Sequence, residues 1–286
     1  MGIISGLLSM FGWGTSDFFA AKSSRKIGYM PTYFWTQLVT LAVALIYFLL
    51  KFPAININSA SQFLIFLIPA GFLFMVATIA FYRGFVRGQV SLVSPIGSSW
   101  SMIVVILSMI FLNEVLKIHQ IIAVILIILG IVLVSINLQE LFKIKKLSLL
   151  TGTKEGIIAM LGWGISLFLI GIASKTIGWF LPVFILKIVG ISVLIIYTLF
   201  GRQSIKTSFQ PPILFLILMV GILDIIAFFS YSFGVEREYA SIVAPIAASF
   251  PLITVILARI FLKEKLVLNQ NLGIVSVIGG LILISI

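Results

Sequence analysis

The stretch GWGTSDFF at residues 12–19 returns as GWGISLFL at residues 162–169, and this recurrence decides the fold. Both copies lie inside apolar runs, and both keep Gly-Trp-Gly followed two residues later by serine. The acid of the first copy, Asp17, is replaced by Leu167 in the second. The sequence therefore contains a repeated scaffold with a polar position that the two copies do not share.

The repeat extends over the whole chain without a gap. A shift of 150 residues lays SLVSPIGSS, which begins at residue 91, on SIVAPIAAS, which begins at residue 241. The same shift lays IFLNE at residue 110 on IFLKE at residue 260. We interpret this as a duplication, with a first repeat at 1–137, a connecting loop at 138–153 and a second repeat at 154–286.

The composition indicates a protein embedded in lipid. Hydrophobic residues make up 61% of the 286 residues and charged residues only 9%, which excludes an ordinary soluble domain. The first apolar run lacks a basic leader and a recognisable cleavage site, so we expect it to be retained as a span. Runs of about 20 apolar residues predict ten transmembrane helices, and no strands, in the cell membrane. They lie near 2–21, 32–50, 62–83, 90–112, 118–137, 156–174, 181–200, 212–234, 239–262 and 270–286.

Each repeat contains five spans, an odd number, so the second repeat enters the membrane in the opposite orientation. This predicts two inverted five-helix repeats related by a pseudo-twofold axis in the membrane plane. On the even-numbered side of the spans lie five basic residues: Lys51, Lys117, Lys175, Lys187 and Arg237. The remaining Lys and Arg residues lie on the side of the odd-numbered loops. The positive-inside rule then places the odd-numbered loops in the cytoplasm and both termini outside.

The chain resembles the EamA family of the drug/metabolite transporter superfamily. The resemblance rests on the opening GWG helix, on FLNE and FLKE, and on SIVAPIAASFPLITVILARIFLKEKL in the second repeat. It implies a ten-helix transporter of small metabolites with a central cavity. The chain departs from the family at Ser101, where the second repeat keeps Pro251, and in its predicted orientation, since the family usually has cytoplasmic termini.

Two acids are the main candidates for the site. Asp17 follows Ser16 and Trp13 on adjoining parts of one helical face, and a carboxylate within a span should face the bundle interior. It would bind a substrate ammonium group or support proton coupling; the alternative is an interfacial ion pair with Lys22 or Arg25. Asp224 lies near the middle of its span and suits reversible protonation, the alternative being a neutral Asp bonded to a neighbouring helix.

Other residues could line a cavity or pack the bundle. Tyr231 shares a helical face with Asp224, and Ser91, Ser94, Ser98, Ser101 and Ser108 form a stripe of hydroxyls. Small polar residues in membrane helices often serve close packing, and Tyr often anchors a helix at the interface, so both interpretations stay open. The further candidates for the cavity are Thr78, Tyr82, Trp100, Trp163 and Ser166.

For four further groups of residues, the interpretation is mainly structural. Pro95 and Pro245 occupy equivalent positions inside spans and predict paired kinks, either gates or fixed bends. The glycines at 12, 14, 162 and 164 are expected to allow close helix approach. We expect Gln37 and Lys187, which are equivalent in the two repeats, to be anchors at the membrane boundary. Glu114 and Glu264 end their helices and are expected to face water or a basic loop.

The function that these patterns favour is secondary transport of a small organic metabolite, such as an amino acid, by alternating access with proton coupling through Asp224 supported by Asp17. Uptake of a sugar is the alternative within transport, and a lipid flippase or a membrane sensor is the alternative outside it. One histidine, no cysteine and no phosphate-binding loop argue against an enzyme, a metal or another cofactor. The expected partners are the solute, protons and the bilayer, without nucleic acid, for a monomer or homodimer.

Overall fold

The structure is a computed structural model that describes residues 1–51, 58–87, 93, 96–136, 138, 152–263 and 266–286. Every regular element within these ranges is a helix. The α-helices are α1 (Gly2–Ile27), α2 (Tyr29–Lys51), α3 (Leu64–Arg87), α5 (Trp100–Phe111), α6 (Ile118–Ser135), α8 (Thr153–Ile177), α9 (Phe180–Phe200), α10 (Pro211–Arg237), α11 (Ala240–Ala248), α12 (Phe250–Leu262) and α13 (Leu268–Ile284). A 3-10 helix, η2 (Asn58–Phe63), leads into α3.

The described helices confirm the predicted class, an all-α integral membrane protein. Seven helical spans are long and apolar enough to cross a bilayer, with α11 and α12 together forming one of them. Two shorter apolar helices, Ile96–Phe111 and Leu268–Ile284, occupy the predicted fourth and tenth spans. The remaining span is α1, which carries more small and polar residues. Several helices run a few residues beyond the predicted ends because their flanking polar residues continue the helical turn.

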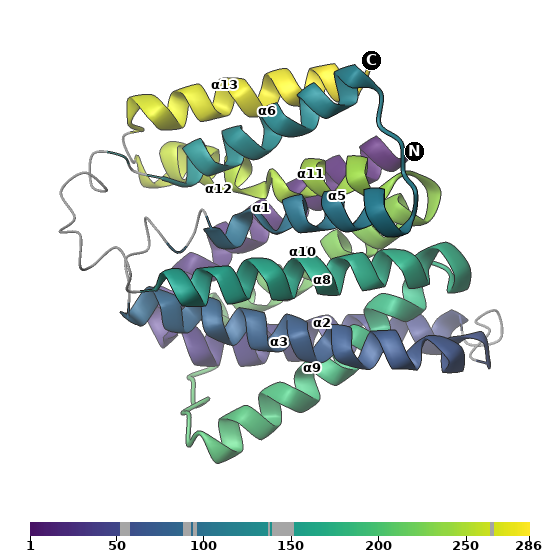
Figure 1. Cartoon of the computed structure of the whole chain (residues 1–286). Coiled ribbons are helices and arrows are strands. Elements are labelled where there is room, and N and C mark those ends of the chain that lie inside the picture. Colours follow the sequence, from purple (N-terminus) through teal and green to yellow (C-terminus); the bar gives the residue numbers. More distant parts are fainter. Residues whose placement is uncertain (52–57, 88–92, 94–95, 137, 139–151, 264–265) are drawn as a thin grey trace.

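The helices pair in the same way in both repeats. In Figure 1, α6 and α13 lie together at one edge, α9 lies at the opposite edge, and both chain ends lie at the same end of the bundle. The first helix of each repeat packs on the third helix of the other, so α1 contacts α10 and α8 contacts α3. This exchange of partners across the repeats is what a pseudo-twofold axis requires.

Equivalent hydrogen bonds show the symmetry at atomic detail. The hydroxyl of Ser16 in α1 donates to the carbonyl oxygen of Val220 in α10, at 3.1 Å. The hydroxyl of Ser166 in α8 donates to the carbonyl oxygen of Ala70 in α3, at 2.8 Å. Both donors and both acceptors are related by the shift of 150 residues. The repeated serine therefore joins the two repeats, which accounts for its presence in both copies.

The span at 239–262 is broken where one continuous helix was predicted. Helix α11 ends at Ala248 and α12 begins at Phe250, with Ser249 between them. The Ser249 amide donates a hydrogen bond to the carbonyl oxygen of Ile246. The Ser249 hydroxyl donates to the carbonyl oxygen of Pro245 at 2.9 Å. Pro245 itself lies inside α11. A proline lacks an amide donor and weakens the turn around it, so we attribute the break to Pro245 together with Pro251, which lies in the first turn of α12. The counterpart of Pro245, Pro95, lies outside the described residues.

The repeated glycines allow the first helix of each repeat to approach its neighbours closely. A Cβ atom placed on Gly14 would lie 2.6 Å from Cβ of Ile253 and 2.6 Å from the carbonyl oxygen of Phe250. The equivalent Gly164 lies as tightly against Ile103. No side chain fits at these positions without moving the neighbouring helix.

We expect Gly14→Val to lower the stability of the folded protein by about 1–3 kcal/mol or more, because overpacking forces the backbone of α12 away from α1. Gly279→Val is the matched control, since nothing lies within 4 Å of a Cβ at Gly279. Thermal unfolding of both purified variants in detergent measures the difference. Equal midpoints for the two variants would contradict the proposed close packing.

Candidate substrate-binding and coupling site

A buried ion pair occupies the middle of the bundle. Nζ of Lys187 in α9 lies 2.8 Å from Oδ2 of Asp224 in α10, and the two side chains are only 2% and 18% exposed. Lys187 lies seven residues after the first residue of α9, Phe180, and thirteen before the last, Phe200. It is therefore well inside the membrane span, and the expectation that Lys187 anchors the boundary is wrong.

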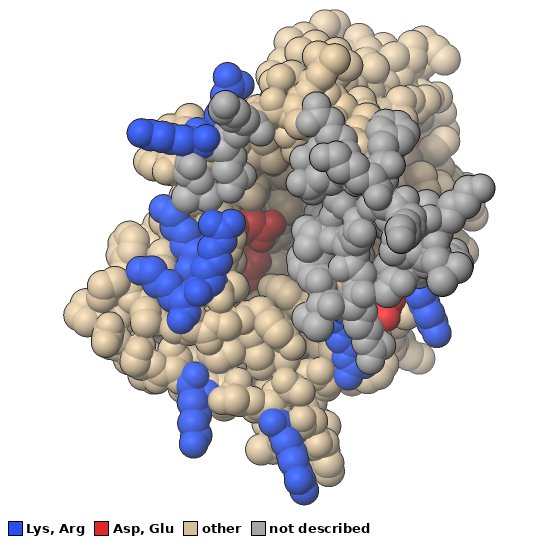
Figure 2. Space-filling view, turned by 90° about the vertical axis from the view of Figure 1, so that its left-hand side faces the viewer, with Lys and Arg blue, Asp and Glu red and all other residues tan. Residues whose placement is uncertain are grey.

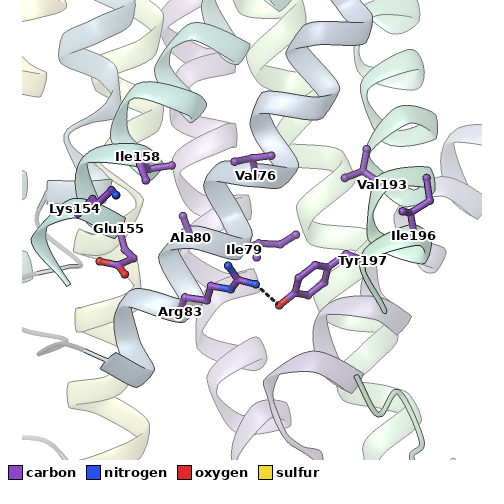
Figure 3. A pocket seen from close by; sticks show the side chains of 10 residues that line it. All are labelled: Val76, Ile79, Ala80, Arg83, Lys154, Glu155, Ile158, Val193, Ile196 and Tyr197. Carbon is purple, nitrogen blue, oxygen red and sulfur yellow. Dashed lines mark hydrogen bonds between the residues drawn. The ribbon is translucent and has the colours of Figure 1, made fainter. Parts of the chain in front are cut away.

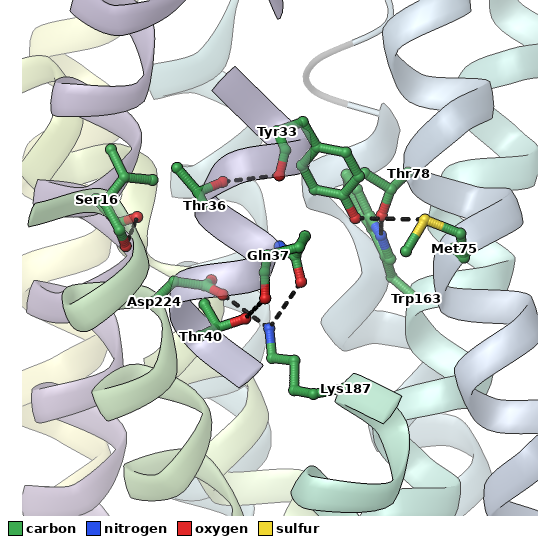
Figure 4. A network of polar contacts seen from close by, with 11 residues as sticks. Ser16, Tyr33, Thr36, Gln37, Thr40, Met75, Thr78, Trp163, Lys187 and Asp224 are labelled. Carbon is green, nitrogen blue, oxygen red and sulfur yellow. Dashed lines mark hydrogen bonds and ion pairs between the residues drawn. The ribbon is translucent and has the colours of Figure 1, made fainter. Parts of the chain in front are cut away.

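The pseudo-twofold axis passes close to this lysine. Gln37 of α2 is the counterpart of Lys187, and its Oε1 lies 3.5 Å from Nζ of Lys187. The ammonium group also lies 3.8 Å from the centre of the Phe228 ring, close enough for a cation–π interaction. Figure 4 shows Lys187 reaching up between Asp224 and Gln37. A buried cation is stable only with such partners, so these contacts fix its position.

Asp17 is the second acid of the site. Helix α1 continues for ten residues beyond Asp17, to Ile27, which places the carboxylate about 15 Å from that helix end. The side chain is exposed and lies within electrostatic range of Asp224. Within the described residues no ion pair joins Asp17 to Lys22 or Arg25, and the Lys22 ammonium lies over the Phe18 ring at 4.5 Å.

The surface offers a route to the interior. Figure 2 shows an end of the molecule where Lys and Arg side chains gather, and a hollow there has acidic atoms at its base. An exposed acid in the middle of a helix, such as Asp17, requires contact with such a space if lipid is to be avoided. The described structure is thus hollowed toward the basic end, where the odd-numbered loops lie.

The structure brings three of the predicted site residues toward this interior. Nε1 of Trp163 donates to the hydroxyl of Thr78 at 3.0 Å, which joins α8 to α3. Tyr82, one turn further along α3, stacks on Tyr29 with ring centres 5.4 Å apart. The Tyr33 hydroxyl points to the sulfur of Met75, at 3.6 Å. Together they form an aromatic and hydroxyl-bearing wall beside the ion pair.

Other predicted residues form a packed aromatic cluster. The ring centre of Trp13 lies 5.1 Å from that of Phe228, 5.9 Å from Tyr231, 6.1 Å from Trp100 and 6.3 Å from Phe250. Tyr231 is fully buried. Trp13 is one turn closer than Asp17 to the start of α1, and Tyr231 is two turns beyond Asp224. The cluster therefore separates the two acids from the end of the bundle opposite the hollow.

The serine stripe is buried against neighbouring helices where the structure describes it. Ser98 is 4% exposed, whereas Ser101 and Ser108 are fully buried, and the hydroxyls of Ser101 and Ser108 have no hydrogen-bond partner within the described residues. Ser166 bonds to backbone as given above. None of these side chains joins the Lys187 network, while Ser91 and Ser94 lie outside the described residues.

Glu114 closes the end of the bundle opposite the hollow. Its carboxylate, 2% exposed, lies 2.9 Å from Nζ of Lys175. It also accepts hydrogen bonds from the amides of Ala240 and Ser241, at 3.0 and 2.9 Å, and from the Ser241 hydroxyl at 2.6 Å. The expectation that Glu114 faces water or a basic loop is wrong, because the free amides at the start of α11 attract it. Glu264 lies outside the described residues.

These contacts make Glu114 sensitive to acid. Burial by itself would raise the pKa of Glu114, but the bonds from the Ser241 hydroxyl, Lys175 and the two amides outweigh burial, so its pKa is lowered from the ordinary 4.5. The stabilisation is therefore fully present above pH 4.5 and is lost as the pH falls through the lowered folded-state pKa.

We expect Glu114→Gln to cost on the order of 2–3 kcal/mol of stability at pH 7, since hydrogen bonds to a charged group are lost. Below pH 4.5 the stabilities of wild type and variant should converge, because the wild-type carboxylate is being protonated. Unfolding of both proteins in detergent at a series of pH values measures the difference between their stabilities. The other titratable groups are the same in both proteins, so their contributions cancel in this difference. Glu238→Gln is the control, and a constant difference at every pH would contradict the role of the charge.

Sequence reasoning missed Lys187, Gln37 and Tyr33 as members of the site. The position of Lys187 near the middle of its apolar run was a usable signal, because the same criterion selected Asp224. No sequence signal distinguishes Tyr33 from other tyrosines near helix ends. Among the described residues no group of three His, Cys, Asp or Glu side chains is placed to hold a metal ion.

Two inverted five-helix repeats around a polar interior define a membrane transporter fold. The profile of the EamA-like transporter family matches residues 1–136 and 151–286, and the chain belongs to this family. It is therefore a multi-pass membrane transporter of the drug/metabolite transporter superfamily.

Two comparisons extend this result. An uncharacterized protein of Methanocaldococcus jannaschii is 34% identical over 137 residues, which cover 47% of this chain and 96% of the relative. That relative is about as long as one repeat, in agreement with a five-helix unit that was duplicated here. A solved structure described only as the crystal structure of a protein shares the fold with a TM-score of 0.77, at 12% identity over 99% of this chain and 95% of the other.

Proposed function

We propose that the protein is a proton-coupled secondary transporter of a small zwitterionic metabolite, with amino acids and related solutes as the substrate class. The buried Lys187–Asp224 ion pair carries this proposal, together with Asp17, for which the described part of the chain provides no ion-pair partner. Lys187 and Asp224 neutralise each other, so Asp17, when ionised, adds a negative charge to the interior. A solute with one ammonium and one carboxylate group has charges complementary to Asp17 and Lys187.

Protonation of Asp224 provides a route from proton binding to solute binding. A proton on Asp224 removes the charge that holds Lys187, and the ammonium group becomes free to bind the carboxylate of the solute. Solute release and deprotonation restore the ion pair. The partners of Lys187, Gln37 and the Phe228 ring, limit how far the ammonium moves during this exchange. Asp17 would bind the solute ammonium group throughout.

Alternating access follows from the unequal ends of the bundle. The hollow in Figure 2 opens toward the basic end, while the aromatic cluster and the Glu114 contacts occupy the other. We assign the described state as open to the cytoplasm. Opening to the other side requires Glu114 to leave Lys175 and the start of α11, and the break at Ser249 gives α11 a hinge for this motion.

The orientation can be tested because the chain has no native cysteine. Val115→Cys, at a residue 77% exposed between α5 and α6, should react with an impermeant maleimide in intact cells. Lys26→Cys, exposed at the end of α1, should react only after permeabilisation, because the positive-inside rule places that end in the cytoplasm. The reverse pattern would overturn the orientation and with it the assignment of the open side.

The substrate class can be tested in proteoliposomes with a panel of labelled amino acids, organic cations and sugars, with and without a pH gradient. We expect zwitterionic amino acids to accumulate only with the gradient. Accumulation of a sugar, unaffected by Asp17→Asn, would favour the sugar permease instead. Movement of labelled lipid between leaflets, without solute transport, would favour a flippase, and no transport of any kind would favour a sensor.

A further inference from the structure

A second hollow lies between α3, α8 and α9 at the basic end, with a volume of about 500 Å³. Figure 3 shows its lining side chains. On α3, Val76, Ala80 and Arg83 point into it, whereas Thr78 and Tyr82 belong to the site described above. At 100° per residue these two sets occupy opposite sides of the helix. The groove therefore faces outward between the helices, on the side of α3 away from Thr78, and its residues Ile79, Val193 and Tyr197 pack in the same cluster as Tyr33 and Tyr82.

Basic groups gather at the end of the groove nearest the membrane surface. Arg83 and Lys154 are both exposed there, and Nη2 of Arg83 donates to the Tyr197 hydroxyl at 3.3 Å, as Figure 3 shows. Lys154 lies in the first turn of α8, whose N-cap, Gly152, provides no side-chain cap. The amides of this turn add positive potential. Glu155 also lines the groove and has contacts of its own, which leaves one formal positive charge in excess.

Apolar residues continue the groove toward the middle of the membrane. On each helix an apolar residue of the groove lies one turn inward from a polar residue: Ile79 from Arg83, Ile158 from Lys154, and Val193 from Tyr197. This arrangement places a cationic head region at the surface and an apolar channel beneath it. It has the shape and chemistry of a site for an anionic amphiphile.

The pseudo-twofold axis supplies an internal comparison. The shift of 150 residues relates Arg83 to Phe233 and Lys154 to Ile4. There, Trp179 lies against Phe233 and Phe229, with ring centres 6.3 and 5.2 Å apart. Aromatic rings thus occupy the position that is hollow and basic in the other repeat. The other repeat thus packs without these two cations, which occur only at the basic end of the bundle.

We propose that this groove binds a phospholipid with an anionic phosphate headgroup, with its phosphate on Arg83 and Lys154 and one acyl chain along the apolar residues. Guanidinium and ammonium groups are the preferred protein partners of phosphate. The positive-inside rule places this end of the bundle at the cytoplasmic leaflet, where anionic lipids are enriched, and basic pockets between transmembrane helices on that side bind such headgroups. The lipid would hold α9 against α3 and α8.

Native mass spectrometry of the delipidated, detergent-solubilised full-length protein tests the proposal. Phosphatidylglycerol should bind the wild type several-fold better than phosphatidylcholine does. Arg83→Gln with Lys154→Gln should lower phosphatidylglycerol binding at least fivefold. Arg25→Gln with Lys26→Gln is the matched control, since it removes two charges from the same end outside the groove, and it should retain binding within twofold.

Additional measurements distinguish a phospholipid from a soluble phosphate as the ligand and control for misfolding of the variants. Inorganic phosphate and glycerol 3-phosphate, at millimolar concentration, should not displace the lipid; displacement by either would identify a soluble phosphate as the ligand and overturn the lipid assignment. Ile158→Trp fills the apolar part without removing a charge and should also lower lipid binding. Equal binding by both double variants, or no preference for phosphatidylglycerol, would refute the site, and neither result bears on solute transport.

Discussion

The Lys187→Met variant should lose on the order of 3–5 kcal/mol of folding stability, which is the usual result of removing one partner from a buried ion pair. Asp224 would then be held in the bundle without its cation, and no described basic residue besides Lys187 is within ion-pair distance of it. The Met side chain preserves most of the volume of the lysine, so the loss reports the charge and not a cavity. Thermal unfolding in detergent, followed by tryptophan fluorescence, measures it.

The second variant of this experiment replaces both charges. Lys187→Met combined with Asp224→Leu should recover most of the lost stability, because replacing a buried ion pair by apolar residues is often neutral or stabilising. Lys51→Met, at an exposed lysine at the end of α2, is the control and should unfold like the wild type. If the double variant were no more stable than Lys187→Met, the loss of stability could not be attributed to Asp224 being left without its cation.

The fold could be predicted from the sequence because the duplication and the apolar runs are both periodic signals. The apolar runs and the repeat together indicate ten spans, and the odd number of spans per repeat sets the inverted arrangement. The matched Ser16 and Ser166 bonds to neighbouring backbone follow from the same duplication. The break at Ser249 was beyond reach, since a proline inside a span predicts a weakened turn without fixing where the helix ends.

The site was less predictable because its members come from different helices. A buried lysine and a boundary lysine look alike in a sequence, since a long side chain can reach water from several positions. Lys187 is buried because α10 brings Asp224 beside it, and no local pattern records that pairing. Removing Lys187 from the charge count leaves an even larger excess of basic residues on the odd-numbered side.

Glu114 shows the same limit in a different form. The sequence places it after the end of its helix, where water is the ordinary partner of a carboxylate. The structure instead uses it to bind the first amides of α11, a helix of the other repeat. Helix starts attract acids wherever the chain brings them together, but only the tertiary fold determines which acid reaches which helix.

The symmetry of the repeats separates scaffold from chemistry. Positions that pack helices, such as Gly14 and Gly164, are shared by the two copies. The charged members of the site are not shared: Asp17, Asp224 and Lys187 correspond to Leu167, Phe74 and Gln37. Since the apolar or neutral counterparts satisfy the packing in one repeat, we expect the charges in the other to serve transport and not only folding.

The Asp224→Asn variant is expected to abolish solute accumulation driven by a pH gradient while leaving exchange of solute for solute. An amide cannot carry the proton that is proposed to release Lys187, but its oxygen can still accept a hydrogen bond from that lysine. With one proton per solute, a gradient of one pH unit supports about tenfold accumulation in the wild type, because a tenfold ratio corresponds to about 1.4 kcal/mol. In the variant the internal solute concentration should not rise above the external concentration.

The measurement compares uptake and exchange in the same proteoliposomes, using the solute identified by the panel. Because Asp224→Asn leaves the Lys187 cation buried without its partner, Asp224→Asn with Lys187→Gln serves as a charge-balanced folding control. It should lose uptake and exchange together, since it also lacks the lysine that is proposed to bind the solute carboxylate. Glu238→Gln keeps the polar interior intact and should accumulate like the wild type. Asp17→Asn should instead weaken both uptake and exchange, since it is proposed to bind the solute. Full accumulation by either Asp224 variant would remove this acid from the coupling mechanism and leave Asp17 as the carboxylate to test next.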